Sequence, residues 1–345
     1  MRRHLVGLLS WTLLLAVAGA CSRQKEEAPT AAKPAEAAKP AEAAKPTPAT
    51  LALNWVPEPE FGGFYAARDS GAYTRRGLEV NIQSGGAGAP VVQRVASGQV
   101  EFGISGADEI LTARARGMDI LPLFTVYQKS PQGIMAHASR GAKNLGDVLS
   151  SGTVALEPGL PYATYLKKKY GFDKVKVVPY DGGVARFVAE KDFAQQCYVF
   201  AEPIAARRQG ADPRVFLIAD EGFDPYIGVV ITRRQLWKEH PERVKGFVEA
   251  SREGWRAYLD NPGPTNQVMG KLNTTMDAET FAAAAEAQKP HVENEETRAN
   301  GLGTMSRQRW ETISQQLLEL GIIDKAPALD EFLLPEFVTQ PAAPR

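Results

Sequence analysis

Residues 50–67 read TLALNWVPEPEFGGFYAA and join an apolar run, a Pro-Glu-Pro loop and a second apolar stretch. The first run, Thr50 to Val56, is short and rich in β-forming residues, which predicts a strand, and Phe61 to Arg75 is predicted as the helix that follows. Asn54 and Trp55 stand where the strand ends and the loop begins. Open α/β sheets bind ligands beyond the carboxyl ends of their strands, so these two side chains are expected to face a ligand cleft.

The same alternation of short β-rich runs and amphipathic stretches continues along the chain. The first series has predicted strands at 78–83, 101–105 and 120–127 and helices at 90–97 and 107–116. A second series starts near Gly133, with predicted strands at 134–138, 153–156, 175–179, 195–200 and 214–219 and helices at 161–170 and 183–190. After a strand at 227–232 the pattern is helical, at 241–259, 264–272, 278–287 and 306–320. A helical tail of that length needs a sheet to cover, so the sequence predicts two α/β lobes.

The N-terminus has the pattern of an export signal. A basic start, Met1 to His4, precedes the apolar run Leu5 to Val17 and the small residues before Cys21. This pattern predicts a lipoprotein signal peptide at residues 1–20, with Cys21 carrying the lipid that anchors the mature chain to a bacterial membrane. The alternative is an ordinary cleaved signal in which Cys21 is incidental. Either way the globular part is expected outside the cytoplasm, in the periplasm if the cell has two membranes.

Residues 21–49 are expected to hold the globular part away from that membrane. The unit Ala31-Ala32-Lys33-Pro34-Ala35-Glu36 recurs from Ala37 and begins again at Ala43. Regular proline prevents a continuous helix, and the segment lacks the large apolar side chains that a core needs. We therefore predict a semi-extended, disordered spacer.

Composition excludes several classes of protein. The chain has 40 basic and 40 acidic residues and no basic stripe, so nothing argues for nucleic acid as a partner. Cys197 is the only cysteine besides Cys21, which excludes an internal disulfide and a cysteine metal cluster in the mature chain. The histidines show no metal-ligand spacing. We expect no metal, no cofactor and a monomer.

Four stretches carry a resemblance to a known family: LNWVPEPEFGGFYAA at 53–67, GAYTRRGLEV at 71–80, ASGQVEFG at 96–103 and QQCYVFAEP at 195–203. Over roughly residues 50–335 the chain resembles the NMT1/THI5-like branch of the sulfonate, nitrate and thiamine-precursor binding proteins, the SsuA/THI5 superfamily. The resemblance implies capture of a solute for an ABC importer, whose permease and ATPase would be the partners.

The resemblance also implies the fold, which is the α/β fold of type II periplasmic binding proteins. Lobe 1 is expected to comprise residues 50–132 and 228–338, including the C-terminal helices, and lobe 2 residues 133–227. Two crossovers would join the lobes, and the ligand cleft would lie between them.

Aromatic and amide side chains of the first lobe are candidates for the cleft. Asn54 offers a donor and an acceptor, and Trp55 offers a stacking face, which together suit a flat heteroaromatic ring. The alternative is that Trp55 is a core residue. Phe64 and Tyr65 are candidates for a further aromatic wall, although one of them must pack inward in any amphipathic helix.

Two turns before predicted helices are further candidates. Ser84-Gly85-Gly86 precedes the helix at 90–97, where backbone amides can receive an anionic oxygen, and the alternative is a tight turn. Gly106 and Asp108 open the helix at 107–116, where Asp108 either caps the helix or faces the ligand.

Second-lobe candidates follow predicted strands in the same way. Tyr162, at the start of a helix after Glu157, either closes the cleft from the opposite side or packs beneath the loop. Gly182-Gly183 permits close approach of a ligand and is equally typical of a turn. By resemblance, the segment with Tyr198 and Glu202 contributes ligand contacts, and a carboxylate there would accept hydrogen bonds from an aminopyrimidine. The alternative for Glu202 is a carboxylate favoured by the dipole at a helix N-terminus.

These features predict a binding protein rather than an enzyme. The ligand expected first is a thiamine-related pyrimidine, then riboflavin, and then a sulfonate or nitrate, which Glu202 would repel. A ligand-sensing lipoprotein is an alternative outside transport. Fungal pyrimidine synthases of the same family carry a cysteine-rich iron motif near the Glu-Pro segment, where this chain has only Cys197, so that activity is not expected.

Overall fold

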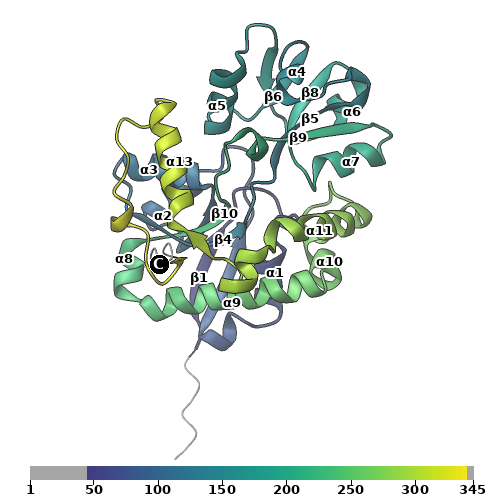
Figure 1. Cartoon of the computed structure of the whole chain (residues 1–345). Helices are drawn as coiled ribbons and strands as arrows, with labels where there is room; N and C mark the ends of the chain where they lie inside the picture. Colours follow the sequence, from purple (N-terminus) through teal and green to yellow (C-terminus); the bar gives the residue numbers. More distant parts are fainter. Residues whose placement is uncertain (1–44, 340–345) are drawn as a thin grey trace, which may run out of the picture. The chain divides into compact units, whose positions relative to one another are not determined.

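Two five-stranded sheets form the framework of the chain (Figure 1). The structure is a computed structural model that describes residues 45–339. The predicted signal peptide, Cys21 and the predicted spacer up to residue 44 lie outside the described residues. Within residues 45–339 we find no helix with the length and apolar character of a membrane span.

The first sheet has the strand order β2-β1-β3-β10-β4. Its strands are β1 (Thr47–Ala52), β2 (Leu78–Gln83), β3 (Phe102–Ser105), β4 (Ile120–Tyr127) and β10 (Ile227–Arg233). β1 runs parallel to β2 and β3, whereas β10 is antiparallel to β3 and β4. Its helical elements up to β4 are η1 (Pro59–Phe61), α1 (Gly62–Asp69), η2 (Thr74–Arg76), α2 (Val91–Ala96) and α3 (Ala107–Ala115).

The second sheet has the strand order β7-β6-β8-β5-β9. Its strands are β5 (Gln132–His137), β6 (Thr153–Leu156), β7 (Lys176–Pro179), β8 (Phe193–Tyr198) and β9 (Pro213–Leu217). Its helical elements are η3 (Ala138–Arg140), α4 (Leu145–Val148), α5 (Pro161–Tyr170), α6 (Ala185–Ala189), α7 (Glu202–Arg208) and η4 (Ala219–Glu221). Here β5 is the strand that runs antiparallel to both of its neighbours.

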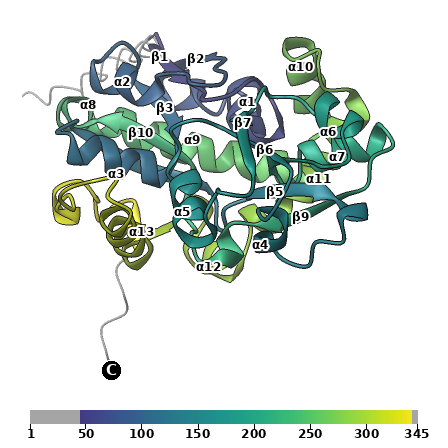
Figure 2. The same cartoon turned by 90° about the horizontal axis from the view of Figure 1, so that it is seen from above.

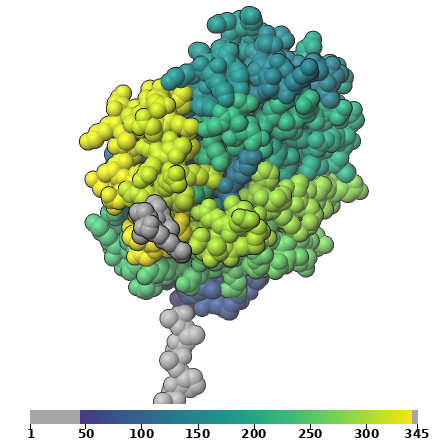
Figure 3. All heavy atoms as spheres, in the orientation of Figure 1, coloured from purple at the N-terminus to yellow at the C-terminus, as the bar shows by residue number. Residues whose placement is uncertain are grey.

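The remaining elements follow β10 and pack on the first sheet. They are α8 (Arg234–Glu239), α9 (Pro241–Asp260), α10 (Gly263–Leu272), α11 (Ala278–Val292), α12 (Glu295–Asn300), β11 (Met305–Ser306), α13 (Arg307–Glu319), η5 (Leu329–Glu331) and β12 (Val338–Thr339). Figure 3 shows the yellow C-terminal region lying against the second lobe, where Gln316 Nε2 donates to Gly222 O at 2.7 Å.

The chain passes between the sheets twice, through residues 128–131 after β4 and residues 218–226 before β10. Arg309 of α13 joins both crossovers, because its guanidinium donates to Gln128 O of the first and to Asp224 O of the second. Asp224 Oδ1 also accepts from Ser130 N at 2.8 Å. This arrangement of two α/β lobes with two crossovers confirms the predicted type II fold.

The Phe-Gly-Gly-Phe-Tyr stretch is explained by close packing of α1 on α9 (Figure 2). A Cβ atom on Gly63 would lie 2.2 Å from the Trp255 ring, so only glycine allows the helices to approach this closely. Phe64 and Tyr65 are fully buried, and Phe64 meets Trp255 edge to face with ring centroids 5.8 Å apart. The prediction that these two residues wall the cleft is therefore wrong: they belong to the core of the first lobe.

Several element boundaries differ from the predicted ones. β1 begins at Thr47, inside the predicted spacer, and tolerates Pro48 because β3 pairs with β1 only at Leu51 and Ala52. The predicted helix from Phe61 ends at Asp69, since Gly71 takes a φ of 74°. α11 continues through Pro290 to Val292. Proline has no N–H to donate to the carbonyl of Glu286, four residues earlier, and this is tolerated because Glu286 is exposed.

Candidate functional site

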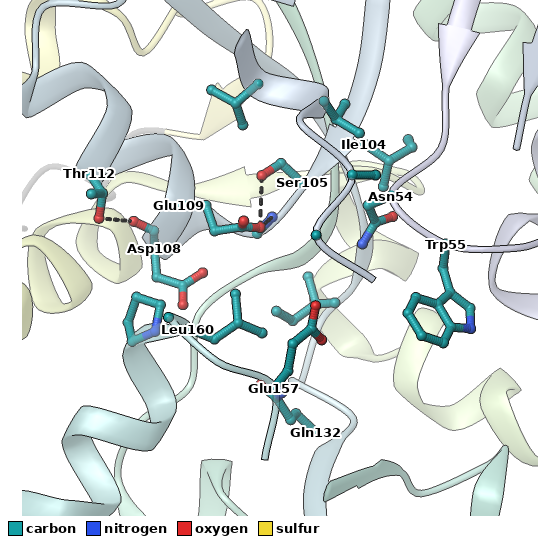
Figure 4. Close-up of a pocket in the computed structure, with 18 of the residues that line it drawn as sticks. Asn54, Trp55, Ile104, Ser105, Asp108, Glu109, Thr112, Gln132, Glu157 and Leu160 are labelled. Atoms are coloured by element: carbon teal, nitrogen blue, oxygen red, sulfur yellow. Dashed lines mark hydrogen bonds between the residues drawn. The ribbon is translucent and has the colours of Figure 1, made fainter. Parts of the chain in front are cut away.

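A cavity of about 430 Å³ lies between the two sheets and is lined from both lobes (Figure 4). The first lobe contributes the loop after β1 and the start of α3. The second lobe contributes the loop after β6, the end of β8 and the start of α7. The polar and aromatic lining residues are Asn54, Trp55, Glu58, Glu60, Gln93, Ser105, Asp108, Glu109, Thr112, Arg116, Gln132, Glu157, Tyr180, Gln196, Tyr198 and Glu202.

Asn54 and Trp55 lie where β1 has ended and the chain turns toward η1. Both are half-buried and line the cavity. Within the described residues, Asn54 Oδ1 is buried without a hydrogen-bond partner. A buried acceptor of this kind is costly unless a donor reaches it, so Asn54 offers an unused acceptor to whatever occupies the cavity.

Two carboxyl groups follow in the same loop. Glu60 is 9% exposed, and no described residue hydrogen-bonds to its carboxyl group. Glu58 Oε1 accepts a long hydrogen bond from Asn273 Nδ2 at 3.5 Å, and the Trp55 side chain also lies close enough to donate to the Glu58 carboxyl group. Burial, together with the charge of Glu202, raises the pKa of Glu58 to about 8. Burial, reinforced by Glu58 and Glu202, raises the pKa of Glu60 well above its ordinary value.

The start of α3 supplies two more carboxyl groups, and these are internally supported. Glu109 Oε2 accepts from Ser105 Oγ at 3.0 Å and from Gly106 N at 3.2 Å. Asp108 is buried beside it, and burial together with Glu109 raises the pKa of Asp108 to about 7. The helix N-terminus holds both groups in place against the cavity.

The loop after β6 is fixed by a buried tyrosine. Tyr162 OH hydrogen-bonds to Gln196 Oε1, and Glu157 N donates to both Tyr162 OH at 3.0 Å and Gln196 Oε1 at 2.8 Å. Tyr162 is 1% exposed and does not line the cavity. It packs beneath the loop and positions Glu157, whose carboxyl group points into the cavity in Figure 4.

Glu202 stands at the first position of α7 and is also held from both sides. Tyr180 OH donates to its Oε1 at 2.6 Å, and Tyr198 N donates to its Oε2 at 2.7 Å. Burial raises the pKa of Glu202, although these two donors act in the opposite direction. Glu202 thus both lines the cavity and serves the start of α7.

An aromatic pair spans the two lobes. The rings of Trp55 and Tyr180 have centroids 6.5 Å apart and planes inclined by 18°. Gly182, with a φ of 84°, lies against the same indole: a Cβ atom there would be 3.3 Å from Trp55 Cζ2. The second lobe therefore meets Trp55 with one aromatic face and one glycine.

Six carboxyl groups line the cavity, while Arg116 is the only lysine or arginine among its described lining residues. Arg116 is exposed at the end of α3, away from the η1 loop. Where they ionise, carboxyl groups this close together repel an anionic ligand and favour a ligand with positive charge or hydrogen-bond donors. Among residues 45–339 no group of histidine, cysteine and acidic side chains is arranged to hold a metal ion.

Seven predicted site residues line the cavity: Asn54, Trp55, Gly106, Asp108, Glu157, Tyr198 and Glu202. Ser84-Gly85-Gly86 lies outside it, and Gly85 is needed for packing, since a Cβ atom there would lie 2.1 Å from Leu53 O. The amide of Gly85 already donates to Trp55 O, and that of Gly183 to Asp181 Oδ1. The Gly85 amide is therefore not free to receive an anion, and the Gly183 amide closes its own turn.

The sequence interpretation missed Glu58, Glu60, Glu109, Tyr180 and Gln196. The signal for the first two was present, because both glutamates belong to the loop that follows the first predicted strand. Tyr180 follows β7 just before Gly182, and only the approach of the second lobe brings it to Trp55.

Comparison with known proteins places this geometry in context. The family model described as NMT1/THI5 like matches residues 58–264. The riboflavin-binding protein RibY of Chloroflexus aurantiacus is 27% identical over 345 residues, which covers 94% of this chain and 95% of that protein. The formylaminopyrimidine-binding protein of Halalkalibacterium halodurans is 21% identical, covering 76% of this chain and 82% of that protein.

Solved structures agree with the fold. The aliphatic sulphonate binding protein SsuA of Escherichia coli matches with a TM-score of 0.64 at 15% identity, covering 87% of this chain and 96% of that chain. At this identity the match reports the arrangement of the two lobes and leaves the ligand open.

Proposed function

We propose, since the chain belongs to the NMT1/THI5-like family, that it is the extracytoplasmic solute-binding protein of an ABC importer and captures a flat heteroaromatic solute. The relatives that cover most of the chain are named as binding proteins, and the fold is that of periplasmic binding proteins. Binding of a solute is therefore supported by the relatives. What we propose in addition is that the chain serves an importer and that its solute is heteroaromatic.

The observation that carries the proposed ligand class is the Trp55–Tyr180 pair. One ring comes from each lobe, and both face the cavity with nearly parallel planes. A flat ring that stacks on Trp55 therefore also contacts the second lobe, so its binding favours the form in which the lobes are together. This is how such a ligand would signal its presence to a membrane permease.

We propose two classes of heteroaromatic solute for the cavity. A volume of about 430 Å³ is within the range of small-molecule sites, and holds either a flavin or a pyrimidine with accompanying water. The named ligands of RibY and of the formylaminopyrimidine-binding protein belong to these two classes. Sulfonate and nitrate suit the cavity poorly, because six carboxyl groups surround the space that the anion would occupy.

A thermal-shift screen tests the ligand class. Riboflavin and 4-amino-5-hydroxymethyl-2-methylpyrimidine are compared with ethanesulfonate and nitrate on the purified chain. Binding to the native state stabilises it by RT ln(1 + [L]/Kd), about 2.7 kcal/mol at a hundredfold excess over Kd. We expect at least one heteroaromatic compound to raise the melting temperature. A shift with the anions alone would contradict the proposal.

Lipid anchoring at Cys21 is a separate part of the proposal, supported by the sequence pattern of residues 1–21. Cys21→Ala is expected to move the protein from the membrane fraction to the soluble fraction and to abolish palmitate labelling. Unchanged fractionation of the variant would rule the anchor out and leave the ligand class untouched.

A further inference from the structure

The carboxyl group of Glu60 has no structural role that its contacts explain. It is 9% exposed, lines the cavity, and receives no hydrogen bond from the described residues. Neighbouring contacts use other atoms: Gln288 Nε2 donates to Pro59 O, and Asn273 Nδ2 donates to Pro57 O. A largely buried carboxyl group that lines a cavity and has no donor from the described residues points to a partner that arrives with the ligand.

The groups around Glu60 indicate what kind of partner its carboxyl group needs. Glu58 lies two residues earlier in the same loop, and Glu202 approaches from α7 of the second lobe. Tyr127 of β4 and Tyr198 of β8 are the other titratable groups whose pKa values the charge of Glu60 raises. From α11, which packs on η1, Gln288 is neutral and already engaged with Tyr127 OH and Pro59 O. Among these described neighbours there is no cation.

We infer that Glu60, with Glu58 beside it, is a specificity-determining residue that pairs with a basic nitrogen of the bound heteroaromatic ligand. The inference rests on the proposed function and narrows it to a basic heterocycle. A cationic N–H edge would supply both the donor that Glu60 lacks and the charge that the Glu58, Glu60 and Glu202 carboxyl groups jointly favour. Asn54 Oδ1, the other unpartnered acceptor of the same loop, would receive a further N–H of the ligand.

The loop geometry supports a positioning role for its proline residues. Pro57 and Pro59 flank Glu58, and their carbonyls are held by Asn273 and Gln288. With φ fixed at both prolines and both carbonyls anchored, the loop backbone presents the two carboxyl groups to the cavity with a smaller entropy loss on binding. The backbone on either side of Glu58 is thus fixed, and Glu60, which follows Pro59, depends on this anchoring because no described residue bonds to its carboxyl oxygens.

Titration calorimetry with two probes tests this inference. The basic probe is 4-amino-5-hydroxymethyl-2-methylpyrimidine, and the neutral probe is riboflavin. We expect the basic probe to bind the native chain and to bind Glu60→Gln about tenfold or more weakly, since a charge-assisted hydrogen bond becomes a neutral one. Glu58→Gln should weaken it less. Glu79→Gln, on the exposed face of β2, is the matched control and should leave affinity unchanged.

The outcomes separate the two proposals. Equal affinity of the basic probe for the native chain and Glu60→Gln would overturn the inference and leave the proposed function standing. Tight binding of riboflavin alone, unaffected by Glu60→Gln, would do the same. Binding of neither probe, with ethanesulfonate binding instead, would overturn the proposed function and the inference with it. A denaturant melt of each variant accompanies the titration, and Glu60→Gln is expected to melt no lower than the native chain because no donor loses its acceptor.

Discussion

The two walls of the cavity are built differently. In the second lobe, Glu202 accepts from Tyr180 OH and Tyr198 N, and the Glu157 loop is tied to Tyr162 and Gln196. In the η1 loop of the first lobe, Asn54 Oδ1 has no partner and Glu60 accepts no hydrogen bond from the described residues. Both oxygens of Glu202 are therefore engaged within the second lobe, whereas the η1 loop has unused hydrogen-bond acceptors.

This difference assigns separate tasks to residues of the same chemical type. A carboxylate whose oxygens are already engaged contributes mainly to local structure, and its removal exposes unpaired donors. A carboxylate without partners contributes little to the fold, and its removal is felt by the ligand. By this reasoning Glu202, which the sequence interpretation favoured as a ligand contact, is a positioning residue. Glu60, which the sequence interpretation missed, faces the ligand without a protein partner.

The largest expected effect is on stability and comes from Glu202→Ala. Tyr180 OH and Tyr198 N would both lose their acceptor, and each unsatisfied buried group costs about 1–3 kcal/mol, so the free energy of unfolding should fall by about 2–6 kcal/mol. Glu60→Gln, compared at pH 7 by urea denaturation, should keep or exceed the stability of the native chain. If both variants lose the same free energy, the two walls do not differ as described.

The second effect is on affinity and comes from Trp55→Ala. Loss of a stacking face costs about 1–3 kcal/mol of binding free energy for the heteroaromatic ligand. Because Trp55 is half-buried, its loss of stability should be smaller than the roughly 3–5 kcal/mol that a buried core tryptophan costs. Titration calorimetry measures the loss of affinity, and a denaturant melt measures the loss of stability. Trp55→Phe is the control variant that keeps an aromatic face. Unaltered affinity with a large loss of stability would assign Trp55 to the core.

A further effect is the pH dependence of stability contributed by one residue. The pKa of Glu58 is raised from 4.5 to about 8 in the folded chain, so the folded chain binds the proton more tightly than the unfolded chain. Stability should therefore fall as pH rises from about 4.5 toward 8, and Glu58→Gln should flatten that slope by at most about 1.4 kcal/mol per pH unit. Urea midpoints between pH 5 and pH 9 measure it. An identical slope in both proteins would show that Glu58 is not protonated in the folded state.

Local sequence determined the architecture and the position of the site on it. The alternation of strands and helices follows from periodicities of two and 3.6 residues among neighbouring residues. The crossovers between the two lobes were expected from the resemblance to type II periplasmic binding proteins. Asn54 and Trp55 were predictable for the same reason, because the end of a strand is a local feature and α/β clefts lie beyond such ends.

Tertiary structure alone decided which side chains face the cavity and which of them are satisfied. Phe64 points into the core because Trp255, 191 residues away, packs across Gly63, and no local pattern reveals that contact. Tyr180 reaches Trp55, and Glu202 comes to influence Glu58 and Glu60, only after the crossovers bring the second lobe against the first. A carboxyl group's role depends on the donors around it, and those donors come from segments distant in the chain. The sequence therefore supplies the acidic residues of this cleft, and the tertiary structure determines which of them has no hydrogen-bond donor.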